Sequence, residues 1–187
     1  GANEANTAPL CIRGKKLERF KYDSPVASAQ VKSALLLAAL YSNGCEFSEP
    51  ELSRDHTERM LKGMGAKIKT QGASIALEPM STPLAPLDID VPNDPSSAFF
   101  FAVAACIIPN SHIVLKNVLL NETRIEAYKI LQKMGADIKF KEISGKYESI
   151  GDIEIRYAAL NAVEVSENIS WLIDEAPALA IAFANAK

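Results

Sequence analysis

MLKGMGAKIK, residues Met60–Lys69, recurs as ILQKMGADIK, residues Ile130–Lys139, about 70 residues further along the chain. In both copies, apolar residues at helical spacing are followed by a glycine and then by a short alternating strand. Gly65 and Gly135 fall where the helix is expected to end, a position that tolerates positive φ. The chain is therefore predicted to contain an internal structural repeat.

Three other segments begin with small polar or acidic residues and continue as apolar, alanine-rich runs. They are SPVASAQVKSALLLAALYSNG from Ser24, NDPSSAFFFAVAACIIPNS from Asn93 and IDEAPALAIAFANAK from Ile173. A helix that is apolar on every side is typically buried, so each run predicts a buried helix. Strands are predicted around these helices, at PLCIRG, GCEFSEP, SIALEP, LDIDVP, HIVLKNVL, DIEIRYA and AVEVSENIS.

The elements follow the order strand, buried helix, strand, amphipathic helix, strand and strand, and this order repeats. We therefore predict an α/β (α+β) fold of repeated βαβαββ units, with buried parallel helices and with the sheets outside. The proline-rich stretch Glu78–Pro95 is predicted to connect two domains, which would span residues 1–91 and 92–187. Both ends of the sequence resemble interrupted units, so we expect an internal fragment of a longer protein.

Composition and charge exclude several classes of protein. A net charge of −3 gives no electrostatic basis for binding nucleic acid or an anionic membrane. No apolar run reaches the roughly 18 residues of a membrane span, and the first residues do not have the pattern of a secretory signal. Cys11, Cys45 and Cys106 are scattered, which predicts buried thiols in a reducing cytoplasm. Neither the cysteines nor His56 and His112 have metal-ligand spacing, so no metal site is expected.

The start of the first apolar run offers a candidate anion site. Ser28 lies where a helix N-cap is expected, and capping alone would explain its hydroxyl. Gln30 adds an amide at the mouth of a helix that is otherwise apolar. A helix N-terminus presents free N–H groups and the positive end of the helix dipole. Ser28 and Gln30 are therefore candidates for binding a phosphate with neighbouring hydroxyls, with simple capping as the alternative.

Arg54 lies at the predicted start of an amphipathic helix, where the helix dipole disfavours a cation. Two interpretations remain open: Asp55 or Glu58 compensates the charge, or an external anion does so through the guanidinium. Arg124 occupies the equivalent position of the repeat, beside a Thr123–Glu126 capping box. Arg124 is predicted to be a surface residue paired with a glutamate.

Helix capping accounts for several other polar residues. Asp55 or Ser53 is predicted to cap the first amphipathic helix, and Asp94 is predicted to cap the second apolar helix. Asp174 or Glu175 lies at the start of the third apolar helix, where a carboxylate could be a cap or a general base. No glycine-rich phosphate loop, nucleophile elbow or metal motif occurs in the sequence.

Four motifs in this order, PVASAQVKSALLLA, SRDHTERMLKGMGA, VPNDPSSAFFFAVAA and IDEAPALAIAFA, together resemble the 5-enolpyruvylshikimate-3-phosphate synthase (3-phosphoshikimate 1-carboxyvinyltransferase) family. The resemblance covers essentially the whole chain and implies the enolpyruvyl transferase fold, with two domains that face each other across a cleft. It implies transfer of the enolpyruvyl group of phosphoenolpyruvate to the 5-hydroxyl of shikimate 3-phosphate, with release of phosphate, in chorismate and aromatic amino acid biosynthesis. It also implies that the full-length enzyme is a monomer and uses no metal or organic cofactor.

The resemblance assigns six substrate-binding positions, which are Ser28, Ala29, Gln30, Ser53, Arg54 and Asp174. Ser28, Ser53 and Arg54 are implied to hold the phosphate of shikimate 3-phosphate. Ala29 is implied to contribute its backbone N–H, and Gln30 to contact shikimate 3-phosphate and reach phosphoenolpyruvate.

Asp174 is implied to be the catalytic group, because it matches the aspartate that binds the ring hydroxyls and accepts the proton of the 5-hydroxyl.

Ala29 replaces the second serine of the commoner Ser-Ser-Gln form of the first motif. The Ser-Ala-Gln branch is often associated with insensitivity to glyphosate, which the resemblance makes a candidate inhibitor.

Several catalytic segments of the family do not occur in this sequence, among them an N-terminal lysine and arginine and the C-terminal arginines, so we expect this chain to be inactive by itself.

Three alternatives remain open. A UDP-N-acetylglucosamine enolpyruvyl transferase has the same fold and chemistry, but usually has a reactive loop cysteine and lacks DPSSA. An RNA 3′-terminal phosphate cyclase-like protein is expected to have a basic face and a nucleotide-reactive histidine. The third alternative is a non-catalytic repeat scaffold.

Overall fold

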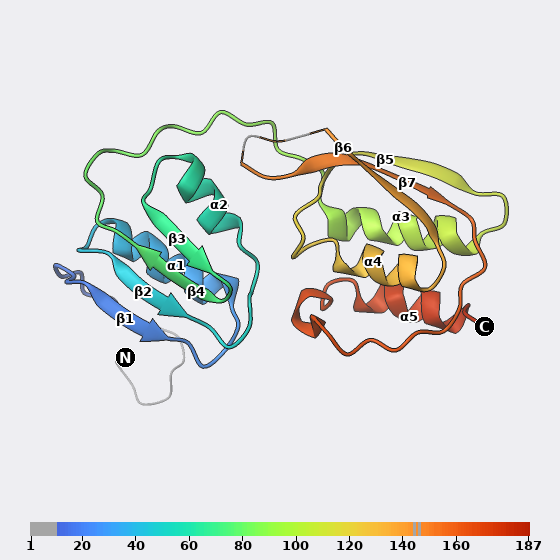
Figure 1. The fold of residues 1–187 in the computed structure, drawn as a ribbon, viewed down its shortest axis with the longest axis horizontal. Helices are drawn as coiled ribbons and strands as arrows, with labels where there is room; N and C mark the ends of the chain where they lie inside the picture. The colour runs from blue at the N-terminus through green and yellow to red at the C-terminus, as the bar shows by residue number, and fades with distance from the viewer. Residues whose placement is uncertain (1–10, 144, 146) are drawn as a thin grey trace.

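The computed structural model describes residues 11–143, 145 and 147–187. These residues form two lobes that an extended segment joins, as Figure 1 shows. The elements of the first lobe are β1 (Phe20–Asp23), α1 (Ala29–Leu40), β2 (Cys45–Ser48), α2 (His56–Gly63), β3 (Ile68–Gln71) and β4 (Ser74–Leu77). The elements of the second lobe are α3 (Pro95–Ile107), β5 (His112–Leu119), α4 (Glu126–Lys133), β6 (Asp137–Glu142), β7 (Ile150–Arg156), the 3₁₀ helix η1 (Ile169–Trp171) and α5 (Ala176–Ala184).

A four-stranded sheet in the order β1-β2-β4-β3 forms the first lobe, with β1 and β2 parallel and the other pairs antiparallel. The register sets Cys45 of β2 and Ile68 of β3 on either side of Leu77 in β4. All three side chains are buried with Leu36 and Ala39 of α1, because alternate residues of a strand face the same side of the sheet. The sheet therefore has one face on α1 and the other face open.

The second lobe has a three-stranded antiparallel sheet in the order β5-β7-β6. Figure 1 shows this sheet on the outer side of α3, α4 and α5, as the sequence predicted. Ile153 and Ile155 of β7 are fully buried in the core beneath the sheet. Tyr128 of α4 is also fully buried, with its ring edge-on to Phe99 of α3 at a centroid distance of 4.9 Å.

The repeated glycines end their helices as the sequence predicted. Gly65 follows α2 with φ of +95°, and Gly135 follows α4 with φ of +100°. The left-handed conformation favours glycine because other residues have a Cβ that crowds the backbone there. The order β1-α1-β2-α2-β3-β4 confirms the predicted βαβαββ unit in the first lobe.

Three predicted strands are wrong. Residues 11–14 of PLCIRG are not a strand, and β1 forms later in the chain, while Pro9 and Leu10 lie outside the described residues. LDIDVP has a proline at its end, which cannot donate a ladder hydrogen bond, and only an isolated parallel bridge from Asn93 to Val118 forms after it. AVEVSENIS has no neighbouring strand among the described residues and ends in η1 instead.

The three apolar helices form where the sequence predicts them, but each is buried on one side only in the described part of the chain. Leu37 of α1 is 52% exposed, Phe101 of α3 is 66% exposed and Ile181 of α5 is 51% exposed. No helix among the described residues is long and apolar enough to cross a membrane.

The cysteines are not all buried, contrary to the sequence prediction. Cys45 and Cys106 are buried, and burial raises the pKa of the Cys106 thiol to about 11. Cys11 is exposed, because it precedes β1 and contributes to neither core.

The two lobes have separate hydrophobic cores. One core comprises residues between Leu36 and Leu77, and the other comprises residues between Phe99 and Ala182. The predicted domain boundary after residue 91 falls between them, within the extended segment, and the boundary itself stays a prediction.

Candidate functional site

Helix α1 begins at the predicted N-cap. The Ser28 hydroxyl accepts a hydrogen bond from the Val31 N–H at 3.4 Å, which confirms the capping prediction. Ala29 is half-buried, whereas the Gln30 side chain is exposed and has no hydrogen bond within the described residues. The first turn of α1 has no acidic residue, so its free N–H groups and positive dipole end carry no compensating carboxylate of their own.

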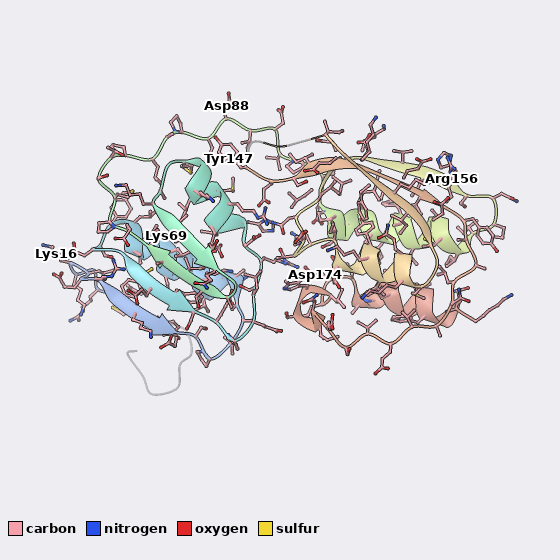
Figure 2. The ribbon with its side chains drawn as sticks, in the orientation of Figure 1. Lys16, Lys69, Asp88, Tyr147, Arg156 and Asp174 are labelled. Atoms are coloured by element: carbon pink, nitrogen blue, oxygen red, sulfur yellow. The ribbon has the colours of Figure 1, made fainter. Side chains whose placement is uncertain are left out.

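Arg54 and Asp174 meet across the two lobes. The Arg54 Nη2 donates a hydrogen bond to the Asp174 Oδ2, and both side chains stay partly exposed. Figure 2 shows Asp174 on the side of the second lobe that faces the first lobe. Of the two interpretations left open for Arg54, compensation by Asp55 or Glu58 is wrong, because both carboxylates have other partners.

Ser53 is not open to a ligand in this structure. Ser53 is 7% exposed, and its hydroxyl donates to the Glu49 Oε2 at 2.7 Å. The carboxylate of Glu49 also accepts a hydrogen bond from the Ser53 N–H at 2.9 Å. The structure therefore brings Arg54 and Asp174 together but directs the Ser53 hydroxyl inward.

The sequence did not predict the buried cluster of charges around Lys32. Lys32 is fully buried in α1, and its Nζ lies 2.9 Å from the Glu49 Oε1 and 2.8 Å from the Glu58 Oε1. Burial raises the pKa of the Glu58 carboxyl, although Lys32 opposes the shift. A lysine inside a run of apolar residues was the signal that could have revealed this cluster.

Arg124 is not a surface residue paired with a glutamate, as the sequence suggested. Its side chain is 13% exposed, and its Nη2 donates to the Asp94 Oδ1 at 2.7 Å and to the Ser96 hydroxyl at 2.8 Å. Asp94 stands at the start of α3, so this contact joins Arg124 to the start of that helix. The Thr123–Glu126 capping box does not form, since the Thr123 hydroxyl donates to the Asn121 side chain instead.

Asp94 caps α3 as predicted, with its carboxylate accepting from the N–H groups of Ser96 and Ser97. Burial opposes ionisation of Asp94, but the hydrogen bonds from Ser97 and Ser96 and the charge of Arg124 outweigh it and lower the pKa of this carboxyl. No such side-chain cap forms at α2 or α5, so the predicted cap by Asp55 or Ser53 is wrong, and so is the capping alternative for Asp174 or Glu175.

Glu175, next to Asp174, is almost completely buried. Its carboxylate accepts a hydrogen bond from the Ser96 hydroxyl, which links the starts of α5 and α3. Burial raises the pKa of the Glu175 carboxyl, although the Ser96 hydrogen bond and the nearby Arg124 oppose the shift. This buried network fixes the backbone on which Asp174 is carried.

Two further sets of contacts join the lobes. Between the lobes, the Asn121 amide donates to the Asp55 Oδ1 at 2.7 Å, and the His56 Nδ1 lies 2.7 Å from the Glu148 Oε1. Within the second lobe, the Asn121 amide also donates to the Glu148 Oε2 at 2.9 Å. The Trp171 Nε1 donates to the Leu52 carbonyl at 2.6 Å. The loop that carries Arg54 is therefore held against the second lobe on both sides of this arginine.

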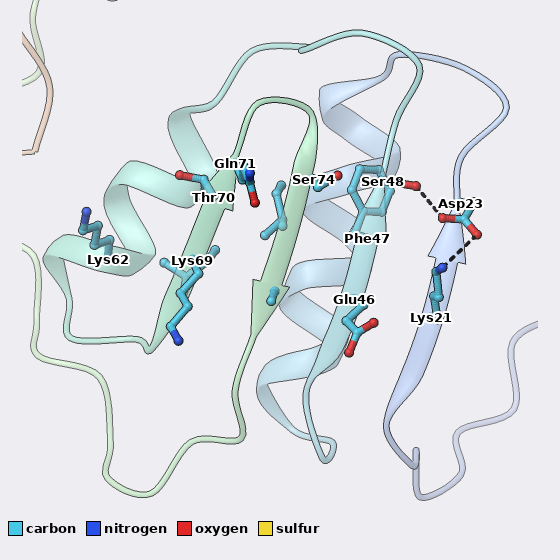
Figure 3. Close-up of a pocket in the computed structure, with 13 residues that line it drawn as sticks. Lys21, Asp23, Glu46, Phe47, Ser48, Lys62, Lys69, Thr70, Gln71 and Ser74 are labelled. Carbon is cyan, nitrogen blue, oxygen red and sulfur yellow. Dashed lines mark hydrogen bonds and ion pairs between the residues drawn. The ribbon is translucent and has the colours of Figure 1, made fainter.

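One hollow lies elsewhere, on the open face of the first sheet. It has a volume of about 920 Å³, and Figure 3 shows Lys21, Glu46 and Lys69 along its walls. Charges of both signs line it, and none of the predicted site residues does. Among the described residues, no group of three or more His, Cys, Asp or Glu side chains is arranged to hold a metal ion.

The family model described as EPSP synthase (3-phosphoshikimate 1-carboxyvinyltransferase) matches residues 1–187, the whole of the sequence. This chain belongs to the EPSP synthase family. Proteins named 3-phosphoshikimate 1-carboxyvinyltransferase are 78% identical to it in Campylobacter concisus and 67% identical in Campylobacter hominis. In both cases the alignment covers 100% of this chain and 44% of the relative, so the chain spans less than half the length of these relatives.

Solved structures of the EPSP synthase family have the same fold. EPSP synthase from Acinetobacter baumannii matches with a TM-score of 0.89 and 42% identity, over 99% of this chain and 43% of that one. The enolpyruvyl transferase NikO from Streptomyces tendae matches with a TM-score of 0.70 at 18% identity, which supports the fold alone. The predicted enolpyruvyl transferase fold is thereby confirmed.

Proposed function

We propose that the full-length protein, meaning these residues within a chain of the relatives' length, transfers the enolpyruvyl group of phosphoenolpyruvate to the 5-hydroxyl of shikimate 3-phosphate. The reaction is an addition followed by an elimination, through a tetrahedral ketal phosphate, and it releases inorganic phosphate. Family membership and the high identity to relatives named 3-phosphoshikimate 1-carboxyvinyltransferase support this proposal.

Arg54 is the proposed binding group for the phosphate of shikimate 3-phosphate. A guanidinium binds phosphate oxygens through parallel N–H donors, and the side chain of Arg54 is 34% exposed and so accessible to a ligand. Ser28, the N–H of Ala29 and the exposed amide of Gln30 are proposed to complete the substrate site at the start of α1. Gln30 is also proposed to reach phosphoenolpyruvate.

Asp174 is the proposed proton acceptor. The 5-hydroxyl must lose its proton as it attacks phosphoenolpyruvate, and a carboxylate within hydrogen-bond reach can accept it. Asp174 is 49% exposed and is not used in capping α5, so it is free to contact ring hydroxyls once Arg54 moves to a ligand.

The contact between Arg54 and Asp174 is the observation that carries the proposal. These residues are 120 positions apart in the sequence, yet a proposed phosphate-binding cation and a proposed base converge at the junction of the lobes. The Asp174 carboxylate accepts a hydrogen bond from Arg54, as an oxygen of an anionic ligand of this arginine would.

The decisive test measures phosphate release by the full-length protein with phosphoenolpyruvate and shikimate 3-phosphate. Turnover with shikimate 3-phosphate, lost in Asp174→Asn and Arg54→Ala, is the expected result. Turnover with UDP-N-acetylglucosamine instead would favour the related transferase, and absence of turnover with either acceptor would leave a scaffold. The 187-residue chain alone is expected to be inactive, so turnover by it would contradict that part of the proposal.

Other properties are proposed on the same basis. We expect a monomeric cytoplasmic enzyme that does not bind nucleic acid, in keeping with the net charge of −3. Glyphosate is a candidate inhibitor, and the Ser-Ala-Gln form that includes Ala29 is typical of the branch often associated with insensitivity to it. The inhibition constant of the full-length protein tests this expectation.

A further inference from the structure

Lys32 has no part in the proposed reaction, yet the fold buries it completely. It is the fourth residue of α1, in a helix whose other buried residues are Leu36, Ala39 and Leu40. Removing an ammonium group from water is unfavourable unless its charge and its donors are satisfied. The contacts of Lys32 therefore indicate what the buried charge organises.

The Lys32 ammonium contacts two carboxylates and one carbonyl on different parts of the first lobe. The Nζ lies 2.9 Å from the Glu49 Oε1 and 2.8 Å from the Glu58 Oε1, and it donates to the Ser53 carbonyl at 3.3 Å. Glu49 follows β2 and Glu58 belongs to α2. The ammonium thus joins α1, the end of β2, the loop before α2, and α2 itself.

Every polar group of Ser53 forms a hydrogen bond with this cluster. Its N–H and its hydroxyl both donate to the Glu49 carboxylate, at 2.9 Å and 2.7 Å, while its carbonyl accepts from Lys32. Arg54 is the next residue, so these bonds fix the backbone from which its side chain extends. A further hydrogen bond, between the Ser33 and Thr57 hydroxyls at 2.6 Å, also joins α1 to α2.

We infer that Lys32, Glu49 and Glu58 are positioning residues that hold Arg54 in the orientation in which it binds the phosphate of shikimate 3-phosphate. In this arrangement Ser53 acts through the cluster and not as a direct phosphate ligand, which departs from the role that family resemblance implied. The inference rests on the proposed function of Arg54. Binding groups must be held to a fraction of an ångström, which supporting hydrogen bonds achieve.

The first test is the Glu49→Gln variant of the full-length protein. It keeps the shape of the side chain but places an amide donor beside the Ser53 N–H and the Lys32 ammonium. We expect the KM and the Kd for shikimate 3-phosphate to rise roughly 10- to 100-fold, with a much smaller change in kcat at saturation. An unchanged Kd in a folded Glu49→Gln variant would overturn the inference.

A double-mutant cycle separates positioning from a general loss of structure. If Glu49 acts through Arg54, then Glu49→Gln has little further effect on affinity in the Arg54→Ala background. A purely structural role would produce the same fold-loss in both backgrounds and would contradict the inference. Ser53→Ala is the milder variant if Glu49→Gln does not fold, and its effect is also expected to vanish in the Arg54→Ala background.

Asp152→Asn provides the matched control. Asp152 is a buried carboxylate of β7 that pairs with Lys116 at 2.7 Å and accepts from the Asn117 N–H at 3.0 Å. Its loss is expected to lower the melting temperature without changing the Kd for shikimate 3-phosphate. An equal fall in affinity in Asp152→Asn and Glu49→Gln would contradict a specific role for the Lys32 cluster.

The outcomes also separate this inference from the proposed function. Binding of shikimate 3-phosphate that depends on Arg54 but not on Glu49 would overturn only the positioning role. If the unaltered full-length protein does not bind shikimate 3-phosphate, the proposed function fails, and the inference fails with it.

Discussion

Arg54 and Asp174 form an ion pair between the two lobes, from positions 120 residues apart in the sequence. Both side chains are partly exposed, at 34% and 49%, and an ion pair in such a setting contributes only about 0–1 kcal/mol. A phosphate dianion offers Arg54 more acceptor oxygens and more charge than one carboxylate does. If the proposed function is correct, shikimate 3-phosphate would replace Asp174 on Arg54 at small cost, which would leave Asp174 available for the hydroxyl.

The exchange of partners predicts opposite effects of Asp174→Asn on binding and on turnover. In the full-length protein, kcat is expected to fall roughly 10²- to 10⁴-fold, the usual contribution of a general base. Affinity for shikimate 3-phosphate should be unchanged or slightly higher, because Arg54 no longer has a competing carboxylate. Calorimetry and steady-state kinetics test this, with the exposed Glu167→Gln as the control; a large loss of affinity without loss of kcat would contradict it.

Asp94 is predicted to stabilise the fold in a pH-dependent way. Its pKa lies below the ordinary value of 3.8, so the folded state favours the ionised form. The contribution is fully present above about pH 4 and is lost as the pH falls through the lowered pKa. Asp94→Ala should cost about 1 kcal/mol near pH 7, and Asp94→Asn less, because asparagine also caps helices. Urea denaturation at neutral and acidic pH tests this; a cost that grows as the pH falls would contradict it.

Glu175 is predicted to act in the opposite sense. Burial raises its pKa above the ordinary value of 4.5, so the folded state binds this proton more tightly than the unfolded state does. Its contribution to the free energy of unfolding therefore decreases as the pH rises from about 4.5 through the raised pKa. Glu175→Gln should remove this decrease and gain stability relative to the unaltered protein between pH 4 and pH 7. Thermal melts followed by circular dichroism provide the measurement, and a Glu167→Gln control should show no such trend.

Gly63, the last residue of α2, packs closely against the ring of Tyr147, which lies between β6 and β7 in the chain. A Cβ at this position would clash with the ring. Gly63→Ala is therefore expected to destabilise the full-length protein by less than the roughly 1–3 kcal/mol that overpacking costs in a core, because Gly63 is exposed and the ring is only partly buried. In the Tyr147→Ala background the sign should reverse, because alanine is better than glycine in a helix by up to about 1 kcal/mol. Destabilisation of equal size in both backgrounds would show that the ring is not the cause.

The sequence predicted the elements that depend on local pattern. The repeated Gly65 and Gly135, the cap at Ser28 and the cap at Asp94 are all confirmed, because helix ends depend on residues a few positions apart. The strand expected at LDIDVP is wrong, since a strand needs a neighbour, and the alternating pattern contains no information on whether one is present.

The partners of the charged residues were harder to predict. Arg54, Arg124 and Lys32 all pair with carboxylates at least 17 positions away, which sequence proximity cannot identify. Proximity suggested Asp55 or Glu58 for Arg54, and both were wrong. The roles of the substrate-binding positions came from family resemblance, and they stay predictions until the variants are measured.

The hydrogen bond from the Trp171 indole to the Leu52 carbonyl gives the junction a spectroscopic property of its own. Trp171 is the single tryptophan of these 187 residues, and Leu52 lies two positions before Arg54. Separation of the lobes would break this bond and transfer the half-buried ring to water, which shifts indole emission to longer wavelength. Movement of the loop that carries Arg54 against the second lobe can therefore be followed by intrinsic fluorescence, without attaching a dye.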